Sequence, residues 1–365
     1  MLLKRKWFLH QMDVTTAFLN ATLDEEIYMQ QPEGYEISKG SDLVCKLNKS
    51  LYGLKQASLA WNQRVDKVLR NLGFIRNRAE NCLYFKKDDH SMLIVALYVD
   101  DILIAGTTDE SVTILKKNLL KEFKMKDLGK VSKFLGLNIK QSDDFKIELT
   151  LRDYIETMVK EYNMKECKPE RTPSMVSQDL TLDEKNHKLL TDLSNYRSLV
   201  GKLLFAANTV RFDISHIVGV LSRYLKEPKE LHWKAAKRVL RYLKDTEDFL
   251  ELPTNMRKDQ KLKDIVILIG PMTNYQESQP LVWCSCMPIG AITWRSKKQA
   301  TIALSTTEAE FMSLCDGAKE AEWLKQVFKD FQLDMTSIKL YKDNQSAIKN
   351  GNTSQCITIE LNTLM

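Results

Sequence analysis

The stretch from Met92 to Gly106, MLIVALYVDDILIAG, constrains the fold of this chain more than any other. Two apolar runs of strand length flank Asp100 and Asp101, which predicts a buried β-hairpin with both aspartates at or beside its turn. Adjacent carboxylates between buried strands repel each other and lose hydration, so a divalent cation, a basic partner or solvent at an exposed tip must offset that cost. The hairpin alone favours the solvated turn.

Length and charge set the broad class of protein. A chain of 365 residues can form two or three domains with their own cores, and 44% hydrophobic with 28% charged residues is ordinary for a globular protein. The net charge of +6 is uneven, because Arg197 to Lys244 holds eleven Lys or Arg against three acidic residues. This local excess predicts a polyanionic partner for that stretch.

The cysteines and the N-terminus indicate a reduced compartment. The seven cysteines are scattered, odd in number and without the paired spacing of a zinc site. The N-terminal MLLKRKWFLHQMD lacks an apolar signal core, and the longest uncharged apolar run is too short to span a membrane. We therefore expect a soluble intracellular protein without a membrane partner, in a cytoplasmic particle or the nucleus.

Local patterns predict the elements around the hairpin. An aspartate, Asp13, lies in a segment with strand character, where a solvated or capping role is the simple interpretation. The predicted elements are a strand leading into a short helix (Trp7–Phe18), a helix after a turn at Tyr52-Gly53 (within Leu43–Leu72), an amphipathic helix (Ser111–Phe123) and an apolar strand that completes the sheet (Phe134–Ile139).

Four ordered blocks carry a family resemblance. QMDVTTAFLN, SLYGLKQASLAW, LYVDDILIAG and KMKDLGKVSKFLGLNI together resemble the reverse transcriptase of copia-type retrotransposons. The resemblance continues through YRSLVGKLLFAANTVRFDI and HWKAAKRVLRYLKDT, in the connecting region of such Pol polyproteins. WRSKKQATIALSTTEAEFMSL and LYKDNQSAI resemble their RNase H domain, so nearly the whole chain is covered.

The resemblance implies an RNA-directed DNA polymerase that uses two Mg²⁺ ions, with Mn²⁺ as the alternative. Asp13 matches the first palm aspartate, Asp100 the second direct metal ligand and Asp101 its acidic neighbour. Two or three aspartates suffice for such ions, since Mg²⁺ takes oxygen ligands and retains waters. The implied partners are an RNA template, a DNA primer, an RNA–DNA hybrid and a deoxynucleoside triphosphate (dNTP).

Further residues are matched one by one. Phe18 matches the bulky side chain that lies under the sugar and excludes a 2′-hydroxyl, although a core Phe would fit the same pattern. Gly53 and Gln56 of YGLKQ, with Tyr98 of YVDD, match positions that line the nucleotide and template. Phe134-Leu135-Gly136 resembles the strand that holds the primer end, and packing or turn geometry would also explain these residues.

The helical stretch HWKAAKRVLRYLK, residues 232–244, has one apolar and one basic arc. The basic arc consists of Lys234, Lys237, Arg238, Arg241 and Lys244. Such an arc is usually a solvated helix face. In a relative of polymerases it is better interpreted as a sequence-independent track for nucleic-acid phosphates.

The C-terminal part matches the RNase H family incompletely. Glu310 in TEAEF, Asp343 in YKDNQSA and Glu360 in CITIEL occupy acidic positions of that family. Where the family has its first aspartate, just after a strand like Ile265–Gly270, this chain reads PMTNYQES. A site without the acid that bridges both metals is predicted not to cleave RNA.

We therefore expect an α+β fold in three parts. These are a reverse transcriptase palm, an antiparallel sheet with helices on one face (1–142), a helical thumb or connection (143–255), and a degraded RNase H-like α/β domain (256–365). Linkers are predicted near 167–184 and 253–263. Only twelve residues precede Asp13, so the fingers that close over the triphosphate are expected to be truncated. The alternative function is a non-catalytic nucleic-acid-binding remnant of the polyprotein.

Overall fold

The computed structural model describes residues 6–37, 43–142, 147–175, 180, 188–246, 264–271, 280–287, 290–298, 306–332, 337–342 and 356–359. The chain divides into two compact units, each described separately below. Unit 1 comprises residues 1–134 and 141–146, and unit 2 comprises residues 135–140 and 147–365. Unit 1 thus contains residues 1–134, 141 and 142 of the predicted palm together with residues 143–146, and the rest of the predicted helical and C-terminal parts falls in unit 2.

Unit 1 is built on a six-stranded sheet in which every neighbouring pair is antiparallel. In spatial order its strands are β4 (Ile75–Arg76), β5 (Leu83–Lys87), β6 (Met92–Tyr98), β7 (Asp101–Gly106), β1 (Phe8–Val14) and β8 (Met125–Lys130). The hairpin predicted from Met92 to Gly106 is confirmed as β6 and β7, and the predicted mixed α/β architecture with an antiparallel sheet is confirmed with it.

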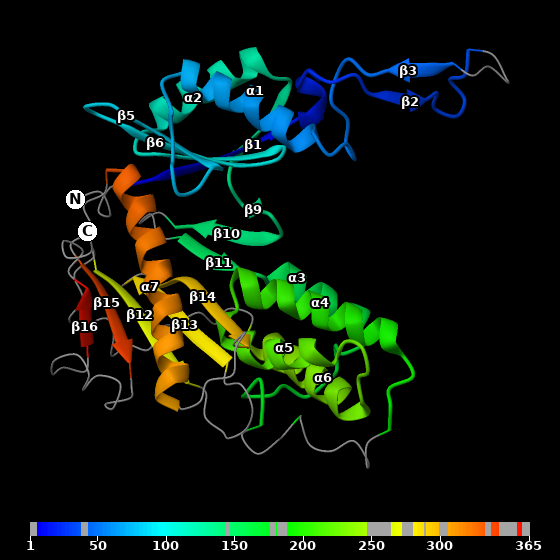
Figure 1. The fold of residues 1–365 in the computed structure, drawn as a ribbon, viewed down its shortest axis with the longest axis vertical. Coiled ribbons are helices and arrows are strands. Elements are labelled where there is room, and N and C mark those ends of the chain that lie inside the picture. The colour runs from blue at the N-terminus through cyan, green and yellow to red at the C-terminus, as the bar shows by residue number, and fades with distance from the viewer. Residues whose placement is uncertain are drawn as a thin grey trace. The chain divides into compact units, whose positions relative to one another are not determined.

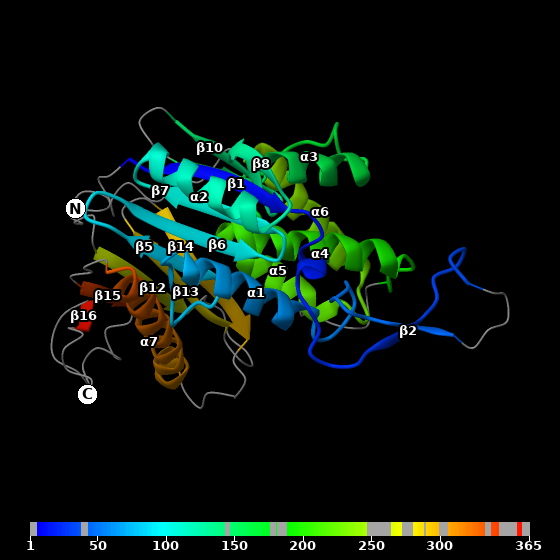
Figure 2. The ribbon, with the colours of Figure 1, turned by 90° about the horizontal axis from the view of Figure 1, so that it is seen from above.

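Two helices cover one face of this sheet, α1 (Ala57–Asn71) and α2 (Asp109–Glu122), as Figures 1 and 2 show. Their apolar sides pack with the strands into one buried core that includes Met12, Val65 and Leu119. Thr108 caps α2, because its side-chain oxygen accepts a hydrogen bond from the Ser111 amide. Unit 1 also contains the 3₁₀ turn η2 (Ala17–Asn20), whose Ala17 and Phe18 join this core, and a two-stranded ribbon of β2 (Tyr28–Gln30) and β3 (Val44–Lys46).

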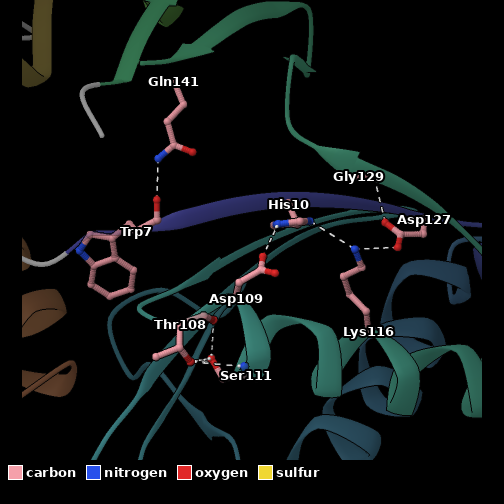
Figure 3. Close-up of polar contacts among 9 residues, drawn as sticks. All are labelled: Trp7, His10, Thr108, Asp109, Ser111, Lys116, Asp127, Gly129 and Gln141. Atoms are coloured by element: carbon pink, nitrogen blue, oxygen red, sulfur yellow. Dashed lines mark hydrogen bonds and ion pairs between the residues drawn. The ribbon is translucent and has the colours of Figure 1, made fainter. Parts of the chain in front are cut away.

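A cluster of charged side chains joins α2 to β1 and β8 (Figure 3). His10 Nδ1 lies 3.2 Å from Lys116 Nζ, and His10 Nε2 lies 3.5 Å from Asp109 Oδ1. Lys116 Nζ also lies 2.6 Å from Asp127 Oδ2, and the Gly129 amide donates to Asp127 Oδ1. Burial and then the charge of Lys116 lower the pKa of His10, which favours the neutral imidazole whose Nδ1 can accept a hydrogen bond from the Lys116 ammonium.

The prediction that Phe134–Ile139 completes the main sheet is wrong. That position, beside β1, is taken by β8, whose side chains are mostly exposed. The backbone of Leu135 and Gly136 has φ of +49° and +83°, which interrupts the predicted strand between β9 (Lys133–Phe134) and β10 (Leu137–Gln141). The chain leaves the main sheet there, and β10 pairs in a smaller sheet with β11 (Ile147–Thr150).

The first part of unit 2 is helical. Its elements are α3 (Arg152–Glu161), α4 (Leu193–Thr209), η3 (Phe212–Ile214), α5 (Ser215–Leu221), η4 (Ser222–Tyr224) and α6 (Glu230–Asp245). They share a core that includes Ile155, Leu203 and Val239. Arg211 is buried there at 2% exposure, and its charge is compensated by Asp213, whose Oδ2 lies 2.7 Å from Arg211 Nη2.

The second part of unit 2 is a five-stranded sheet with one long helix, α7 (Thr306–Asp330). The strand order is β14 (Gly290–Lys298), β13 (Pro280–Met287), β12 (Asp264–Pro271), β15 (Ser337–Lys342) and β16 (Cys356–Ile359). Among the strand pairs of this sheet, β12–β15 is parallel and the other three are antiparallel. A parallel pair requires a long crossover, and this one contains α7. Trp294 of β14 donates to the Ala207 carbonyl of α4 at 2.6 Å, which joins the sheet to the helices within this unit.

Candidate active site

The three aspartates predicted to act together meet at one end of the unit 1 sheet. Tyr98 and Asp101 are paired across the hairpin, so Val99 and Asp100 form its turn. Strand β1 lies against β7 with Asp13 opposite Asp101, and the Val14 amide donates to the Asp100 carbonyl at 2.8 Å. Opposed residues of antiparallel strands have Cβ atoms about 4.5–5.5 Å apart, so the Asp13 and Asp101 side chains are neighbours.

The turn that carries Asp100 is strained and held from one side. Val99 has φ of +55°, in the left-handed region that a β-branched residue rarely adopts. The indole of Trp61, on α1 and only 2% exposed, donates to the Val99 carbonyl at 2.6 Å. Strain of this kind persists only where surrounding contacts enforce it. The Trp61 bond and the Val14 amide are two such contacts, and together they fix the position of Asp100.

Two of the carboxylates already have hydrogen-bond donors. Gln11 Nε2 donates to Asp101 Oδ1 at 3.2 Å, and the Tyr52 hydroxyl donates to Asp100 Oδ2 at 3.1 Å. Partial burial and then the bond to Asp100 raise the pKa of Tyr52, so its phenol keeps the proton that it donates. Within the described ranges, no group of three His, Cys, Asp or Glu side chains is arranged to hold a metal ion.

The Tyr52 ring lies over Phe18. Their centroids are 4.3 Å apart, with the planes tilted by 52°. Phe18 is 8% exposed and Tyr52 is 54% exposed, so of these two stacked rings it is Tyr52 that faces solvent beside the aspartates. Next to it, Gly53 has φ of +99°, a conformation that explains why glycine occurs in this turn. Gln56 stands at the N-cap of α1 without a side-chain capping bond.

Three residues of this site were not predicted from the sequence: Gln11, Tyr52 and Trp61. Gln11 lies two residues before Asp13, which places both side chains on one face of β1. Tyr52 directly precedes the predicted Gly53, and this adjacency was the only available signal. Trp61 carried no signal, because its partner is a backbone carbonyl distant in sequence.

The other residues predicted to contact the nucleotide or the primer are Tyr98 and Phe134-Leu135-Gly136. Tyr98 ends β6, is paired with Asp101 and is 57% exposed. Phe134 is the last residue of β9 in unit 1, and Leu135 and Gly136 belong to unit 2. Their predicted contact with a primer therefore stays a prediction.

The predicted basic arc of α6 is partly covered by this chain itself. Glu170 lies between two of its arginines, 2.8 Å from Arg238 Nη1 and 3.2 Å from Arg241 Nη2. Lys244 Nζ donates to the carbonyls of Lys165 and Cys167.

The other two basic residues of α6 are differently placed. Lys237 Nζ lies 5.2 Å from the centroid of the Trp233 ring, and Lys234 is exposed. Cys167, Glu170 and Thr172 come from the stretch predicted to be a linker, yet they supply partners of Arg238, Arg241 and Lys244. Three of the five predicted phosphate ligands therefore already have protein partners.

The side chains of the predicted RNase H acids lie outside the described part of the chain. Glu310 lies in α7, but its side chain is outside the described part. Asp343, Glu360 and the segment 272–279 also lie outside the described residues. These assignments remain predictions.

Comparisons with known proteins identify the family. The family model "Reverse transcriptase (RNA-dependent DNA polymerase)" matches residues 1–176. The Pol polyprotein from transposon TNT 1-94 of Nicotiana tabacum is 39% identical over 93% of this chain and 26% of its own length. A putative transposon Ty5-1 protein of Saccharomyces cerevisiae is 39% identical over 85% of this chain and 100% of its own length. The Pol polyprotein from transposon RE2 of Arabidopsis thaliana is 33% identical over 94% of this chain.

The chain thus spans about a quarter of the tobacco polyprotein and 23% of the Arabidopsis one. A solved foamy viral protease-reverse transcriptase in complex with double-stranded DNA aligns with 96% of this chain and 54% of its own, at 14% identity and a TM-score of 0.23, an overlap too poor to place any residue. No helix in the described ranges is long and apolar enough to cross a membrane. With the matching relatives, the family model establishes that the chain belongs to the reverse transcriptase family of copia-type retrotransposon Pol polyproteins.

Proposed function

We propose that this chain is an RNA-directed DNA polymerase whose palm is unit 1 and whose catalytic carboxylates are Asp13, Asp100 and Asp101. One observation carries the proposal: Asp13 is the register partner of Asp101, with Asp100 in the adjoining turn. Strands from distant parts of the sequence thus present three carboxylates at one sheet end, as nucleotidyl transfer requires. The substrates would be an RNA template, a DNA primer and dNTPs.

The donor set suits Mg²⁺ or Mn²⁺, because carboxylate oxygens are the ligands that these hard cations prefer. Asp13, Asp100 and Asp101 would hold the ions, and Asp100 would share or release its hydrogen bond with Tyr52. Once bound, the ions would acidify the primer 3′-hydroxyl and neutralise the triphosphate charge. The two-ion arrangement itself is part of the proposal, since the described side chains form no ready three-ligand group.

The chain's own residues would supply positioning. Trp61 fixes the strained turn, Gln11 orients Asp101 and Tyr52 orients Asp100 until metal binds. A fixed turn matters because misplacing a catalytic group by about 1 Å can cost on the order of 100-fold in rate. Phe18, Gly53, Gln56 and Tyr98 would border the nucleotide, with Phe18 acting through the Tyr52 ring that covers it.

For unit 2, we propose an RNase H-like domain that does not cleave RNA. Support comes from the sheet order β14-β13-β12-β15-β16, with its parallel pair β12–β15 connected by a segment containing α7. Glu310, Asp343 and Glu360 would be its remaining acids. The residues after β12, MTNYQES, contain no aspartate. Mg²⁺-dependent cleavage of an RNA–DNA hybrid by the purified chain would contradict this part of the proposal.

Primer extension tests the polymerase. On poly(rA) with an oligo(dT) primer and Mg²⁺, the wild type should extend the primer, and Asp100→Asn should reduce the rate by roughly 10²–10³-fold because a charge that stabilises the transition state is lost. Asp88→Asn, in an exposed loop, is the matched control and should be unchanged.

The same assay separates the polymerase from the binding remnant. A wild type that binds the duplex with strong salt dependence but extends nothing would overturn the polymerase and favour the non-catalytic alternative. The structure supports that alternative less well, because three basic residues of α6 already bind groups of this chain: Arg238 and Arg241 pair with Glu170, and Lys244 donates to a backbone carbonyl.

A further inference from the structure

Two thiols on one strand of unit 2 are in contact. Cys284 and Cys286 belong to β13, and their Sγ atoms lie 3.5 Å apart. Cys286 is 3% exposed, whereas Cys284 is partly exposed. Neither residue has a role in the proposed palm, which lies in unit 1. The pair is therefore a nucleophilic feature that the polymerase chemistry leaves unexplained.

Strand geometry makes this pair able to form a covalent bond. Residues at i and i+2 of a strand point to the same side, and two steps of about 3.3 Å separate their Cα atoms by about 6.6 Å. Disulfides accept Cα separations up to about 6.8 Å, so a bond between these positions is strained but sterically possible. The sulfur atoms need only to approach each other from van der Waals contact.

The ladder beside the pair is irregular. The register between β13 and β14 shifts at the Ser285–Cys286 step, where Thr293 and Ala291 are the successive partners and Ile292 is left over. At such a bulge the hydrogen-bond ladder is disrupted and the local twist increases. A small backbone adjustment at Cys286 therefore costs less here than it would in a regular sheet.

The two thiols also influence each other's protons. The hydrogen bond between the sulfurs raises the pKa of Cys284, with burial adding to the effect, and lowers the pKa of Cys286. The proton is thus held by one sulfur while the other gains thiolate character, which is the reactive form in thiol–disulfide exchange. No other pair of cysteines in the described ranges is joined by a hydrogen bond.

We propose that Cys284 and Cys286 form a redox-sensitive dithiol that closes reversibly to an intrastrand disulfide and captures thiophilic trivalent arsenicals. This site is independent of the proposed polymerase activity. The oxidant is a small disulfide such as glutathione disulfide, and the ligand class is one that binds two sulfurs at once. Because the closed form is strained, it should be readily reduced, as labile disulfides are.

The oxidation is balanced as two exchange steps. The pair first loses one proton to solvent, and the proton left on Cys284 moves along the hydrogen bond to the Cys286 thiolate. The thiolate now on Cys284, the more exposed sulfur, attacks one sulfur of glutathione disulfide and releases a glutathione thiolate, which takes up a proton. Cys286 then loses its proton, and its thiolate displaces the second glutathione from Cys284. Two thiols are oxidised to one disulfide, and one glutathione disulfide is reduced to two glutathione molecules.

Alkylation mapping of the full chain tests the closure. The reduced protein is incubated in glutathione buffers of increasing oxidised fraction, quenched with N-ethylmaleimide, digested and analysed by mass spectrometry. The peptide containing Cys284 and Cys286 should lose the mass of two hydrogens and take up no maleimide, while the exposed Cys315 stays alkylated or carries glutathione. If Cys284 and Cys286 each carry maleimide or glutathione independently, the proposal is wrong.

Phenylarsine oxide provides a second measurement that needs no oxidation. An equimolar amount should abolish maleimide labelling of both Cys284 and Cys286 in the wild type, since a single thiol retains the arsenical poorly. Cys284→Ala should restore labelling of Cys286, and Cys315→Ala, the matched control, should not change the protection. Unprotected labelling of both cysteines in the wild type would overturn the proposal without reference to any variant.

Discussion

The tip of the β6–β7 hairpin and the basic arc of α6 are both clusters of charge that the family resemblance predicts to be functional, but in the structure they have different kinds of partners. At the tip, Asp13 and Asp101 are brought together by strand pairing, and the side chains that donate to Asp100 and Asp101 are neutral. On α6, Glu170 lies against two of the arginines. A charge pattern thus locates ionic groups, but distant residues decide whether those groups are available to a ligand.

The largest expected effect comes from removing the Trp61 hydrogen bond that fixes the β6–β7 turn. Trp61→Phe removes the donor to the Val99 carbonyl and leaves a partly buried acceptor unpaired, which costs about 1 kcal/mol. The Val14 amide, bonded to the Asp100 carbonyl, should then exchange its hydrogen faster by the corresponding factor, and primer extension should fall.

The Thr107 amide, bonded to Met92 at the other end of the hairpin, serves as the internal reference for exchange. Trp233→Phe on α6 is the control variant. Uniform acceleration of both amides would indicate global destabilisation and would remove Trp61 from its proposed positioning role.

The second prediction concerns the covered arc of α6. Glu170→Gln removes the negative charge between Arg238 and Arg241 and should make both available to phosphates. Binding to a nucleic-acid duplex should strengthen, and the slope of log affinity against log salt should steepen by up to about 2. Fluorescence anisotropy over a salt series measures this slope.

Glu166→Gln, at an exposed position near the same segment, is the matched control. An identical slope for the wild type and both variants would mean that α6 does not bind nucleic acid even when Glu170 is neutral. The α6 arc would then differ from the hairpin tip in having no ligand at all.

A smaller effect is expected from Tyr52→Phe. The variant keeps the ring over Phe18 but removes the hydrogen bond that occupies Asp100. The Mg²⁺ concentration for half-maximal extension should fall by roughly 2- to 10-fold, the equivalent of one ordinary hydrogen bond. Mn²⁺ binding followed by electron paramagnetic resonance should shift in the same direction, whether or not the protein extends primers.

Tyr28→Phe is the control for this variant, because the Tyr28 hydroxyl also donates to a carboxylate, Glu26, on an exposed strand. Equal metal binding by wild type and Tyr52→Phe would show that Tyr52 does not compete with cations for Asp100.

The smallest effect is the pH dependence of the unfolding free energy that His10 of β1 contributes. Burial and the charge of Lys116 lower the pKa of His10 below its ordinary value of 6.5, so the unfolded chain binds the proton at higher pH than the folded chain. Between these two values the unfolded state holds more protons, and stability should fall as the pH falls from 6.5 to the folded pKa.

Urea unfolding at several pH values measures this dependence. His10→Asn should flatten the slope in that window, whereas His90→Asn, at an exposed loop position, should leave it unchanged. A slope unaffected by His10→Asn would remove the cluster of Figure 3 as its cause.

Much of unit 1 could be predicted because its signals are local. The hairpin follows from two apolar runs of strand length, β1 from its β-branched and aromatic residues, and α2 from apolar residues at helical spacing, and any short window contains these signals. The prediction for Phe134–Ile139 was wrong because apolar content does not reveal the left-handed backbone of Leu135 and Gly136. Apolar content also favours Phe134–Ile139 over β8, because β8 is an edge strand whose mostly exposed side chains give little hydrophobic signal.

By itself, the sequence determined the family, the local elements and the identity of the three aspartates, because these depend on residue types and short spacings. Tertiary structure alone decided that Asp13 stands opposite Asp101, that Tyr52 rather than Phe18 is exposed beside them, and that Glu170 neutralises part of α6. The physical reason is the same in each case: burial and ion pairing depend on groups that are close in space and far apart in the chain.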